Sequence, residues 1–486
     1  MTIAGFFKNF CLLLLTGMLI CSLSGCKDDD SKKNTPLSTD NINLIFVVSA
    51  DLSYHASGDI NPDTANLTSQ GLHRSLLMAT YLKEQVLGTQ NVTDIYALAP
   101  MTHLQTENNY PDMAAIGSIQ QFALLNQFTF PLEGYTANSF PINAAYGKGS
   151  VPDGVWKPGD DNYCPDCRGL DFDDMEGNNI DLVTGIINEK TPGFYVFSAP
   201  WETTSALMEN INQQKGYGLN IPRSYEGPNH VYVISIPPSG NTSLFTYNSN
   251  LVPSVTYPEL PEPVVIAPCT NTQQPYLKTS RIGGVDGVVI PGNININQTI
   301  YIVRHAEAHP DPEHYFEIGN FVGAGQWRAL DLPNALLGKI NPNMVYSIDP
   351  SQWYSIGFRN VSYVRPSLTV LPFAIASNLP YFLVSSFSIQ DPAQAQLTSD
   401  FFFTGGKFSN QTVLLAWESS RIKPIINSLL DSYGVKTLPR LPEKWPATDY
   451  DTIWTITLDE FGNLTVDNAM CEGIDSENLP VEAPQF

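Results

Sequence analysis

The stretch "TIYIVRHAEAHP", residues 299–310, predicts a buried strand that ends in reactive side chains. Residues 299–303 are all β-branched or aromatic, and such residues favour strands. Arg304 and His305 come directly after them. Side chains capable of chemistry therefore stand at the carboxyl end of the strand, where α/β proteins commonly place their binding residues.

The outline of this stretch occurs a second time, earlier in the chain. "NLIFVVSADLSYHA", residues 43–56, is again an apolar run that ends at a polar step, with Ser49-Ala50 in the place of Arg304-His305. Downstream, Gly71-x-x-Arg74 matches Gly325-x-x-Arg328, each at the start of an expected helix. The offsets are 305 − 50 = 255 and 325 − 71 = 254, so the two copies agree almost to the residue.

The later parts of the two copies also match. "TPGFYVFSAPWETTSALMENIN" at 191–212 resembles "NQTVLLAWESSRIKPIINSLL" at 410–430, which places Trp201-Glu202 over Trp417-Glu418. The offset has fallen to 417 − 201 = 216, so we expect an insertion in the first copy, around 146–180. Two copies of one fold would account for the 486 residues.

The strand pattern predicts an α/β fold. Runs such as "TVLLAW" and "IYIV" show little alternation of polar and apolar residues, which suits a parallel sheet covered by helices on both faces. We therefore expect two tandem three-layer α/β/α domains with mainly parallel sheets. The expected boundaries are 43–250 for the first domain, 251–297 for a proline-rich linker, 298–470 for the second domain and 471–486 for a C-terminal tail.

The second copy resembles the histidine phosphatase superfamily, also called phosphoglycerate mutase-like, whose motif after the first strand is Arg-His-Gly/Ala-Glu. Here the motif reads Arg304-His305-Ala306-Glu307. The resemblance implies that His305 attacks a phosphoryl group and that Arg304 and a later arginine, Arg365, hold the phosphate. It also implies a proton donor, for which Glu307 and Glu418 are the candidates, and no cofactor.

The residue types fit such chemistry. A neutral imidazole is a competent nucleophile near neutral pH, and arginine forks bind phosphoryl oxygens through paired hydrogen bonds. Two alternatives stay open for each acid. Glu307 either donates a proton or only fixes its loop, and Glu418 either donates one or has a structural role, because its counterpart Glu202 persists in the first copy.

The second copy departs from the family at one catalytic position. Some members have Trp-Glu-His where this chain has Trp417-Glu418-Ser419, so Ser419 replaces the second histidine and becomes a candidate for phosphate binding. The function expected is phosphomonoesterase activity on a phosphorylated small molecule or another anion. The alternative is a pseudoenzyme that serves as a binding or scaffold protein.

The first copy is expected to be catalytically dead. Ser49-Ala50 replace the arginine and the nucleophile, and Thr203 stands where Ser419 does. No arginine occurs at 101–121 to take the place of Arg365.

The charge balance argues against nucleic acid as a partner. The chain has 25 Lys and Arg against 48 Asp and Glu, for a net charge of −23. A surface this negative repels phosphate backbones. An anionic substrate therefore needs a local basic pocket.

The start of the chain predicts export and a lipid anchor. One positive charge, Lys8, precedes an apolar run and small residues, as in a signal peptide. Leu23-Ser24-Gly25-Cys26 resembles the lipobox of bacterial lipoproteins, although an ordinary signal with a chance cysteine is the alternative. We expect a signal peptide at 1–25, lipidation of Cys26, a tether at 26–42, and a place in the bacterial cell envelope, anchored to a membrane on the periplasmic side or at the cell surface.

The remaining cysteines suggest disulfides. An even number in an oxidising compartment suggests pairing, and we favour Cys164 with Cys167 and Cys269 with Cys471 among the three possible pairings. A redox motif or half of a metal site at "CPDC" is the less favoured alternative. His309 and His314 lie near the Arg-His motif, but we expect a surface loop and no metal there, because the spacing of a known site is absent.

Overall fold

The computed structural model describes most of the chain after residue 34. The described residues are 35–49, 51, 67–100, 112–129, 139–146, 169–172, 174, 177–269, 277–278, 288–308, 318–350, 353–356, 359–384, 394–434, 441 and 445–486. The predicted signal peptide, Cys26, Cys164, Cys167, His309 and His314 lie outside them.

The first half contains a mixed six-stranded sheet. β1, β6, β2 and β5 are parallel, and β7 and β8 extend the sheet with antiparallel pairs. The strand order is β5-β2-β6-β1-β7-β8. The bounds are β1 Ile42–Val48, β2 Asp94–Ala97, β5 Ala145–Tyr146, β6 Gly193–Ala199, β7 His230–Ile236 and β8 Ser243–Asn248.

The second half contains a sheet with the same arrangement. Its order is β14-β11-β15-β10-β16-β17-β9, and its first six strands pair in the same directions as those of the first sheet. The predicted α/β class is confirmed, although each sheet also has an antiparallel side. The bounds are β9 Leu277–Lys278, β10 Gln298–Arg304, β11 Met344–Ile348, β14 Tyr381–Val384, β15 Thr412–Trp417, β16 Thr452–Leu458 and β17 Leu464–Cys471.

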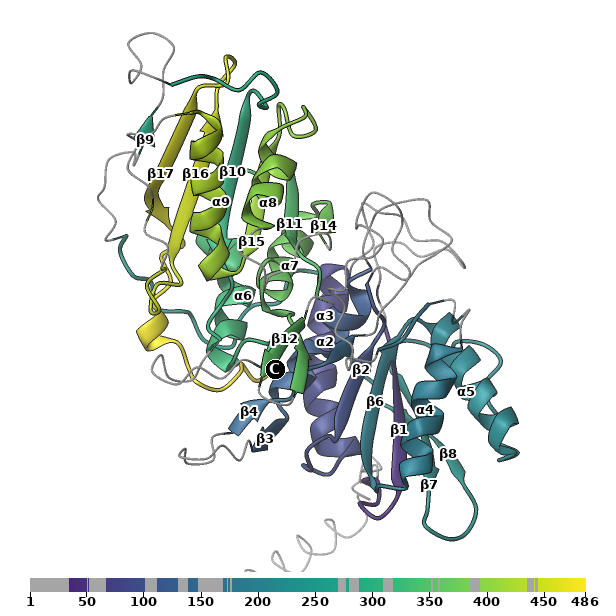
Figure 1. Ribbon diagram of the computed structural model, residues 1–486. Helices are drawn as coiled ribbons and strands as arrows, with labels where there is room; N and C mark the ends of the chain where they lie inside the picture. The colour runs from purple at the N-terminus through teal and green to yellow at the C-terminus, as the bar shows by residue number, and fades with distance from the viewer. Residues whose placement is uncertain are drawn as a thin grey trace, which may run out of the picture. The chain divides into compact units, whose positions relative to one another are not determined.

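Helices cover both sheets (Figure 1). In the second half, Leu414 and Ala416 of β15 pack in the cluster that contains α6 and α7, whereas Val413 and Leu415 pack in the cluster that contains α8 and α9. The second sheet is thus buried on both faces. The helices are α2 Ser69–Tyr81, α3 Ala114–Leu124, α4 Asn178–Glu189, α5 Trp201–Lys215, α6 Gly323–Leu336, α7 Arg365–Ser377, α8 Gln394–Phe403 and α9 Ser419–Ser432.

Four short elements complete the described secondary structure. A π-helical turn continues α2, a 3₁₀ turn lies in the C-terminal segment, and each half has a small antiparallel hairpin. They are Leu82–Val86, Ser476–Asn478, β3 Gln127–Thr129 with β4 Ser139–Pro141, and β12 Trp353–Ile356 with β13 Arg359–Ser362.

One hydrophobic core contains residues from both halves. Gly117 of α3 lies close to Leu371 of α7, where an added Cβ would be 3.3 Å from the leucine side chain. Gln120 donates a hydrogen bond to Asn320 at 2.9 Å. Residues Leu37–Phe486 accordingly form one compact unit, and the division at 251–297 stays a prediction.

The linker and the C-terminal tail are tied to the second half. A disulfide joins Cys269 to Cys471, which is the pairing that the sequence favours. The hydroxyl of Tyr257 donates to the carbonyl of Leu330 in α6 at 2.8 Å. In the tail, the carbonyl of Glu482 accepts a 2.8 Å hydrogen bond from the indole of Trp327.

A buried arginine connects the segments around β10. Arg328 is 0% exposed, and its Nε donates to both carboxylate oxygens of Glu307 at 2.8 and 3.0 Å. Its Nη1 donates to Glu472 at 2.5 Å, and its Nη2 donates to Ser476 at 2.8 Å. One guanidinium thus ties α6 to the loop after β10 and to the tail.

The first half has a smaller version of this connection. Arg74 of α2 donates from Nε to Asp51 at 2.5 Å and from Nη1 to Asn229 at 2.6 Å. In both halves, therefore, an arginine in the first helix is paired with a carboxylate that comes shortly after the first strand.

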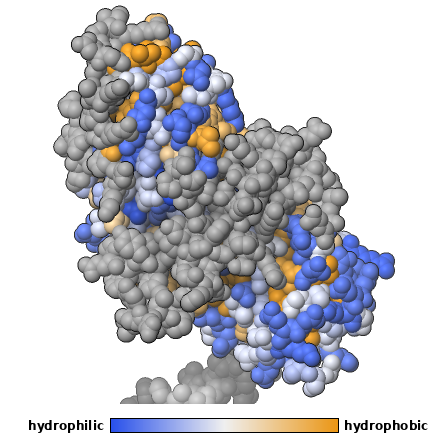
Figure 2. Space-filling view, viewed as in Figure 1, coloured by the Kyte–Doolittle hydropathy of each residue, from blue (hydrophilic) through white to orange (hydrophobic). Residues whose placement is uncertain are grey.

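The surface is largely hydrophilic where Figure 2 shows described residues near α5 and β8. This agrees with the net charge of −23. No helix within the part of the chain that the structure describes is both long and apolar enough to cross a lipid bilayer.

We expect Arg328→Met to reduce the free energy of unfolding by about 3 to 5 kcal/mol, because it leaves the Glu307 carboxylate buried without its cation and Glu472 without its hydrogen-bond donor. Chemical denaturation of the purified protein measures this loss. Arg223→Met, at an exposed position, is the control and should change stability by less than about 0.5 kcal/mol. A loss below about 1 kcal/mol for Arg328→Met would contradict the role given to the network.

Burial raises the pKa of Glu472 to about 8. Arg328 opposes this rise, whereas the charges of Asp451 and Glu307 add to it. Because the folded state holds this proton more tightly than the unfolded state, the contribution of Glu472 to stability is complete below pH 4.5 and is lost as the pH rises to about 8.

We therefore expect Glu472→Gln to flatten the dependence of stability on pH between about 5 and 8, by a few kcal/mol. Unfolding midpoints across this range measure the effect. Parallel curves for the unsubstituted protein and the variant would show that Glu472 does not titrate there.

Candidate functional site

Arg304 and His305 lie where two central parallel strands end together. Arg304 is the last residue of β10 and is in register with Trp417, the last residue of β15. The backbone N–H of His305 donates to the carbonyl of Trp417 at 3.2 Å. The strand pairing therefore fixes the backbone of both motif residues.

The ring of His305 is buried and oriented. It is 2% exposed, and its Nδ1 lies 2.8 Å from the carbonyl of Ala306. Since a carbonyl only accepts, we assign the proton to Nδ1, which places the lone pair on Nε2. Tyr363 and Tyr450 meet the imidazole ring edge-on, with ring centres 6.3 and 6.2 Å away.

The loop of the motif is tied to the start of α7. The backbone N–H of Ala306 donates to the hydroxyl of Thr369 at 2.8 Å, and that hydroxyl donates to the carbonyl of Arg365 at 2.7 Å. Two hydrogen bonds thus connect the residue after His305 to the first residue of α7.

Arg304 is held by the turn before β16. Its Nη1 lies within hydrogen-bond distance of the carbonyls of Pro446, Ala447 and Asp449, at 3.2, 2.9 and 3.0 Å. The guanidinium carbon lies 3.9 Å above the centre of the Tyr450 ring. Within the described residues, the buried Nε of Arg304 has no hydrogen-bond partner.

Arg365 adds a second buried positive charge. Its side chain lies over the ring of Tyr363, at 4.8 Å, and the residue is 1% exposed. Burial lowers its pKa to about 10, Tyr450 and Glu418 oppose this, and the charge of Arg304 lowers the pKa further. The two guanidiniums therefore repel each other, and a bound anion would relieve that repulsion.

Glu418 and Ser419 lie at the start of α9. Glu418 is the N-cap, and its carboxylate accepts from the backbone N–H of Ser420 at 2.8 Å. The hydroxyl of Ser419 donates to the same carboxylate at 3.1 Å. Both residues are half-buried, and Glu418 is electrostatically coupled to Arg365, so the cap belongs to the surroundings of the two arginines.

Glu307 is held by the structural network instead. Its carboxylate accepts from Arg328 and from the hydroxyl of Ser476. The equivalent pair, Asp51 with Arg74, persists in the first half. These contacts fit the second of the two roles left open by the sequence, which is to fix the loop.

The backbone register corrects the alignment of the two motifs by one residue. Val48 is in register with Ala199 at the end of β6, and the backbone N–H of Ser49 donates to the carbonyl of Ala199. By strand register, "VSAD" at 48–51 therefore stands where "RHAE" stands at 304–307, with Ser49 in the place of His305. The sequence comparison places Ser49 over Arg304 instead, because apolar runs align equally well one residue apart.

A similar shift applies to the later turn. α5 begins at Trp201 with Pro200 as its N-cap, whereas α9 begins at Ser419 with Glu418 as its N-cap. Pro200 therefore corresponds to Glu418, and Trp201 corresponds to Ser419. Glu202 is not the counterpart of Glu418, so its presence gives no reason to assign Glu418 a purely structural role.

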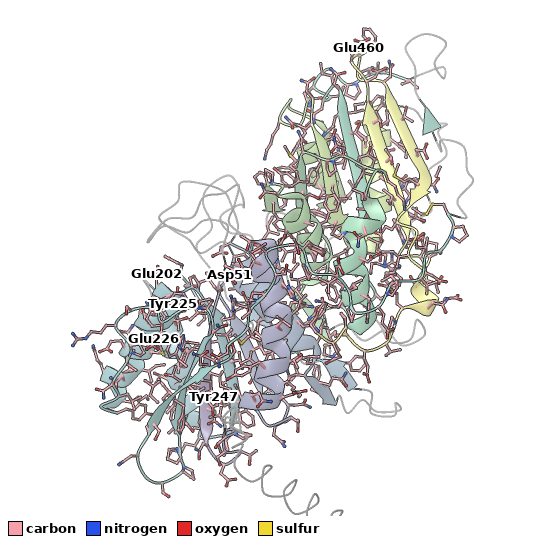
Figure 3. The ribbon with its side chains drawn as sticks, turned by 180° about the vertical axis from the view of Figure 1, so that it is seen from behind. Asp51, Glu202, Tyr225, Glu226, Tyr247 and Glu460 are labelled. Carbon is pink, nitrogen blue, oxygen red and sulfur yellow. A yellow bond between two sulfur atoms is a disulfide. The ribbon has the colours of Figure 1, made fainter. Side chains whose placement is uncertain are left out.

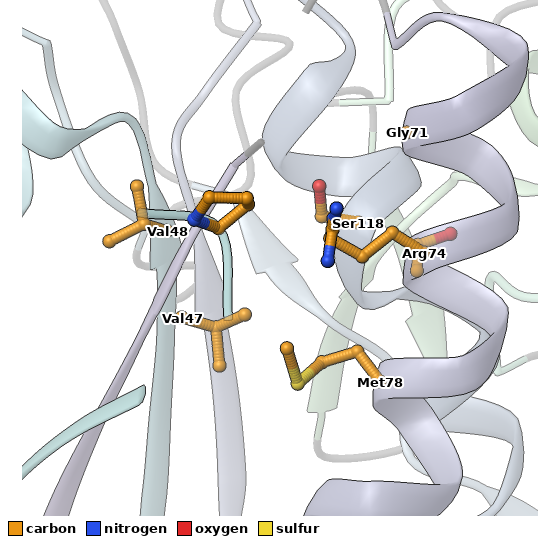
Figure 4. A pocket seen from close by; sticks show the side chains of 8 residues that line it. Val47, Val48, Gly71, Arg74, Met78 and Ser118 are labelled. Carbon is orange, nitrogen blue, oxygen red and sulfur yellow. The ribbon is translucent and has the colours of Figure 1, made fainter. Parts of the chain in front are cut away.

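The corresponding region of the first half has no pair of buried guanidiniums in its described residues. A small cavity of about 20 Å³, room for about one water molecule, lies between β1 and α2 (Figure 4). Val47, Val48 and Met78 line it together with Arg74, whose side chain is paired with Asp51. Its lining lacks the pair of guanidiniums found in the second half.

Acidic and aromatic groups gather at this end of the first sheet. Asp51 and Tyr225 lie there (Figure 3). Burial raises the pKa of Tyr225, and the negative charge of Asp51 adds to the rise. The charge of Arg74, which is paired with Asp51, opposes this rise.

Three site residues were not predicted from the sequence. Tyr363, Thr369 and Tyr450 contact the motif or its arginines. Tyr363 lies two residues before Arg365 and Thr369 lies in the first turns of α7, so their closeness to Arg365 in the sequence offers a weak signal. Tyr450 comes 450 − 305 = 145 residues after His305, and only the pairing of β16 with β10 brings it near.

Comparisons with known proteins find solved structures that resemble part of the chain. No family model and no curated protein match. Solved structures that match include a phosphoglycerate mutase from Plasmodium falciparum, with 14% identity, 40% of this chain and 99% of the other covered and a TM-score of 0.24. A phosphoserine phosphatase from Entamoeba histolytica with 3-phosphoglyceric acid has 14% identity, 35% and 96% coverage and a TM-score of 0.23.

The protein histidine phosphatase SixA, solved with tungstate, also matches, with 19% identity, 36% and 97% coverage and a TM-score of 0.22. These structural neighbours are members of the histidine phosphatase superfamily. At such low TM-scores the likenesses add nothing on function, which depends on the residues of the site.

Proposed function

We propose that the second half is a histidine-phosphatase-like phosphomonoesterase that acts through His305. The supporting observation is the meeting of Arg304, His305 and Arg365 at the carboxyl end of β10, where both guanidiniums are buried and repel each other. Such a pocket favours a compact anion despite the negative charge of the whole chain. In this proposal the chain is a tandem-duplicated member of the superfamily.

In the proposed reaction, Nε2 of His305 forms a bond to phosphorus while the bond from phosphorus to the ester oxygen breaks. The leaving oxygen takes a proton, for which Glu418 is the candidate donor. Water then attacks the phosphohistidine, gives one proton back to Glu418, and releases phosphate with His305 restored.

The arginines have a binding role in this scheme. Arg304 and Arg365 stabilise the charge on the phosphoryl oxygens, in a site where burial strengthens the attraction. Ser419 supplies a hydroxyl where some members of the superfamily have a histidine. A hydroxyl donates one hydrogen bond and carries no charge, so turnover is expected to be slow.

The replacement by Ser419 also favours a second candidate function. In that case the pocket binds a phosphorylated small molecule without turnover, and the protein serves as a binding or scaffold module. Arg304 and Arg365 serve both candidates, whereas the orientation of the imidazole ring by Ala306 favours the enzyme.

The proposed location is the bacterial cell envelope, with a lipid on Cys26. The disulfide between Cys269 and Cys471 supports an oxidising compartment. The pattern of the first 26 residues supports export. Metabolic labelling with a fatty acid, lost in Cys26→Ala, tests the anchor.

We expect the purified protein to hydrolyse p-nitrophenyl phosphate and His305→Ala to lower kcat by on the order of 10³-fold, because the nucleophile is removed. His230→Ala, in the first half, is the matched control and should retain the rate. Equal rates for the unsubstituted protein and His305→Ala would refute the enzyme. Phosphate binding that persists without turnover would then favour the binding module.

A further inference from the structure

The turn at 446–450 contacts the site although no motif of the sequence pointed to it. It supplies three carbonyls and one aromatic ring to Arg304. We propose that Tyr450 is a positioning residue, whose ring holds the Arg304 guanidinium so that its Nε–H faces a bound tetrahedral oxyanion. This inference deepens the proposed function and depends on it.

The carbonyls leave only part of the guanidinium for a ligand. Nη1 has two hydrogens, and the carbonyls of Pro446, Ala447 and Asp449 all lie within 3.2 Å of it. Nη1 is therefore fully engaged within the protein. The donors of Arg304 that remain are Nε and Nη2, so an anion would bind along the edge that carries Nε–H.

The Nε–H group of Arg304 is available to donate a hydrogen bond to a bound anion. It is buried and has no hydrogen-bond acceptor among the described residues, and Arg304 as a whole is 6% exposed. A buried donor without an acceptor is unfavourable, because it has lost its hydrogen bonds to water. An oxygen of a bound oxyanion would accept this hydrogen bond and remove the cost.

The Tyr450 ring fixes the plane in which Nε lies. The guanidinium carbon is 3.9 Å from the ring centre, which is close stacking for a cation over an aromatic face. The carbonyls hold one end of the guanidinium and the ring covers one face, so rotation about the side chain would break one of these contacts. Tyr450 itself is only 8% exposed.

The same ring lies against both the arginine and the proposed nucleophile. The Tyr450 ring meets His305 at 62° with centres 6.2 Å apart. One aromatic side chain thus contacts both the group proposed to bind the phosphoryl oxygens and the group proposed to attack phosphorus. Replacement of the ring should therefore weaken anion binding first, because the Arg304 plane depends on it directly.

The turn keeps its shape without the ring of Tyr450. The indole of Trp445 donates to the carbonyl of Asp449 at 2.6 Å. The carboxylate of Asp449 accepts from the backbone N–H groups of Asp451 and Thr452 at 3.1 and 3.0 Å. A substitution at Tyr450 is thus expected to leave the carbonyls in place.

The test is tungstate binding to the full chain, measured by calorimetry. Because Tyr450→Leu removes the aromatic face on which the Arg304 guanidinium lies, we expect it to weaken binding about tenfold. Tyr450→Phe keeps the ring and should bind within about twofold of the unsubstituted protein. Comparison of the two variants thus distinguishes the effect of the ring on binding from the effect of the hydroxyl.

Tyr346→Leu is the matched control. Tyr346 is a buried tyrosine of the second half that stacks on Phe382, with ring centres 4.8 Å apart, and meets Phe402 and Phe408 edge-on. Its replacement should lower thermal stability about as much as Tyr450→Leu while tungstate binding stays unchanged. Comparable unfolding midpoints then exclude a general loss of structure as the cause of weaker binding.

Two results would overturn the inference alone. Tungstate binding to Tyr450→Leu as tight as to the unsubstituted protein would show that the ring does not position Arg304. A loss in Tyr450→Phe equal to that in Tyr450→Leu would assign the effect to the hydroxyl. No tungstate binding by the unsubstituted protein would overturn the proposed function as well.

Discussion

The architecture of the second half depends on one buried guanidinium. Arg328 is shared among Glu307, Glu472 and Ser476, so the loop after β10, helix α6 and the C-terminal segment are fixed to one another. A buried cation that serves acidic side chains from separate segments is costly to lose, because Glu307 would then be an unpaired buried charge and Glu472 would lose its hydrogen-bond donor. Gly325, one turn before Arg328, lets α6 approach this loop closely, since a Cβ there would lie 2.8 Å from the carbonyl of Glu307.

Both halves have this pairing of an arginine with a carboxylate, but they differ in the residues at the end of the first strand. Arg74 with Asp51 repeats the pairing of Arg328 with Glu307, so the strand-to-helix connection has the same support in each half. The positions held by Arg304 and His305 are Val48 and Ser49 in the first half, by backbone register. The pairing of arginine with carboxylate thus persists where the arginine and the histidine of the motif are replaced, which indicates that the carboxylate has a structural part in both halves.

The sequence predicted the α/β class, which the structure confirms, and it proposed Arg304, His305 and Arg365 as site residues, which stays a prediction. Neighbouring residues determine where a strand ends and where a helix starts, and a change from apolar to polar residues marks these places in the sequence. It placed the first-half motif one residue away from its position and the later turn two residues away. Apolar runs carry little information on register, whereas each backbone hydrogen bond between β1 and β6 specifies it.

The sequence by itself determined which side chains are available at the carboxyl ends of the strands, because the order of residues fixes which side chains come after each strand. Only the tertiary structure decided which of them act together. It assigned Glu307 to Arg328, gave Arg304 three carbonyls and the ring of Tyr450, and left Nε of Arg304 without an acceptor among the described residues. These contacts join residues that are 21 to 146 positions apart, and burial, which no short motif records, determines their strength.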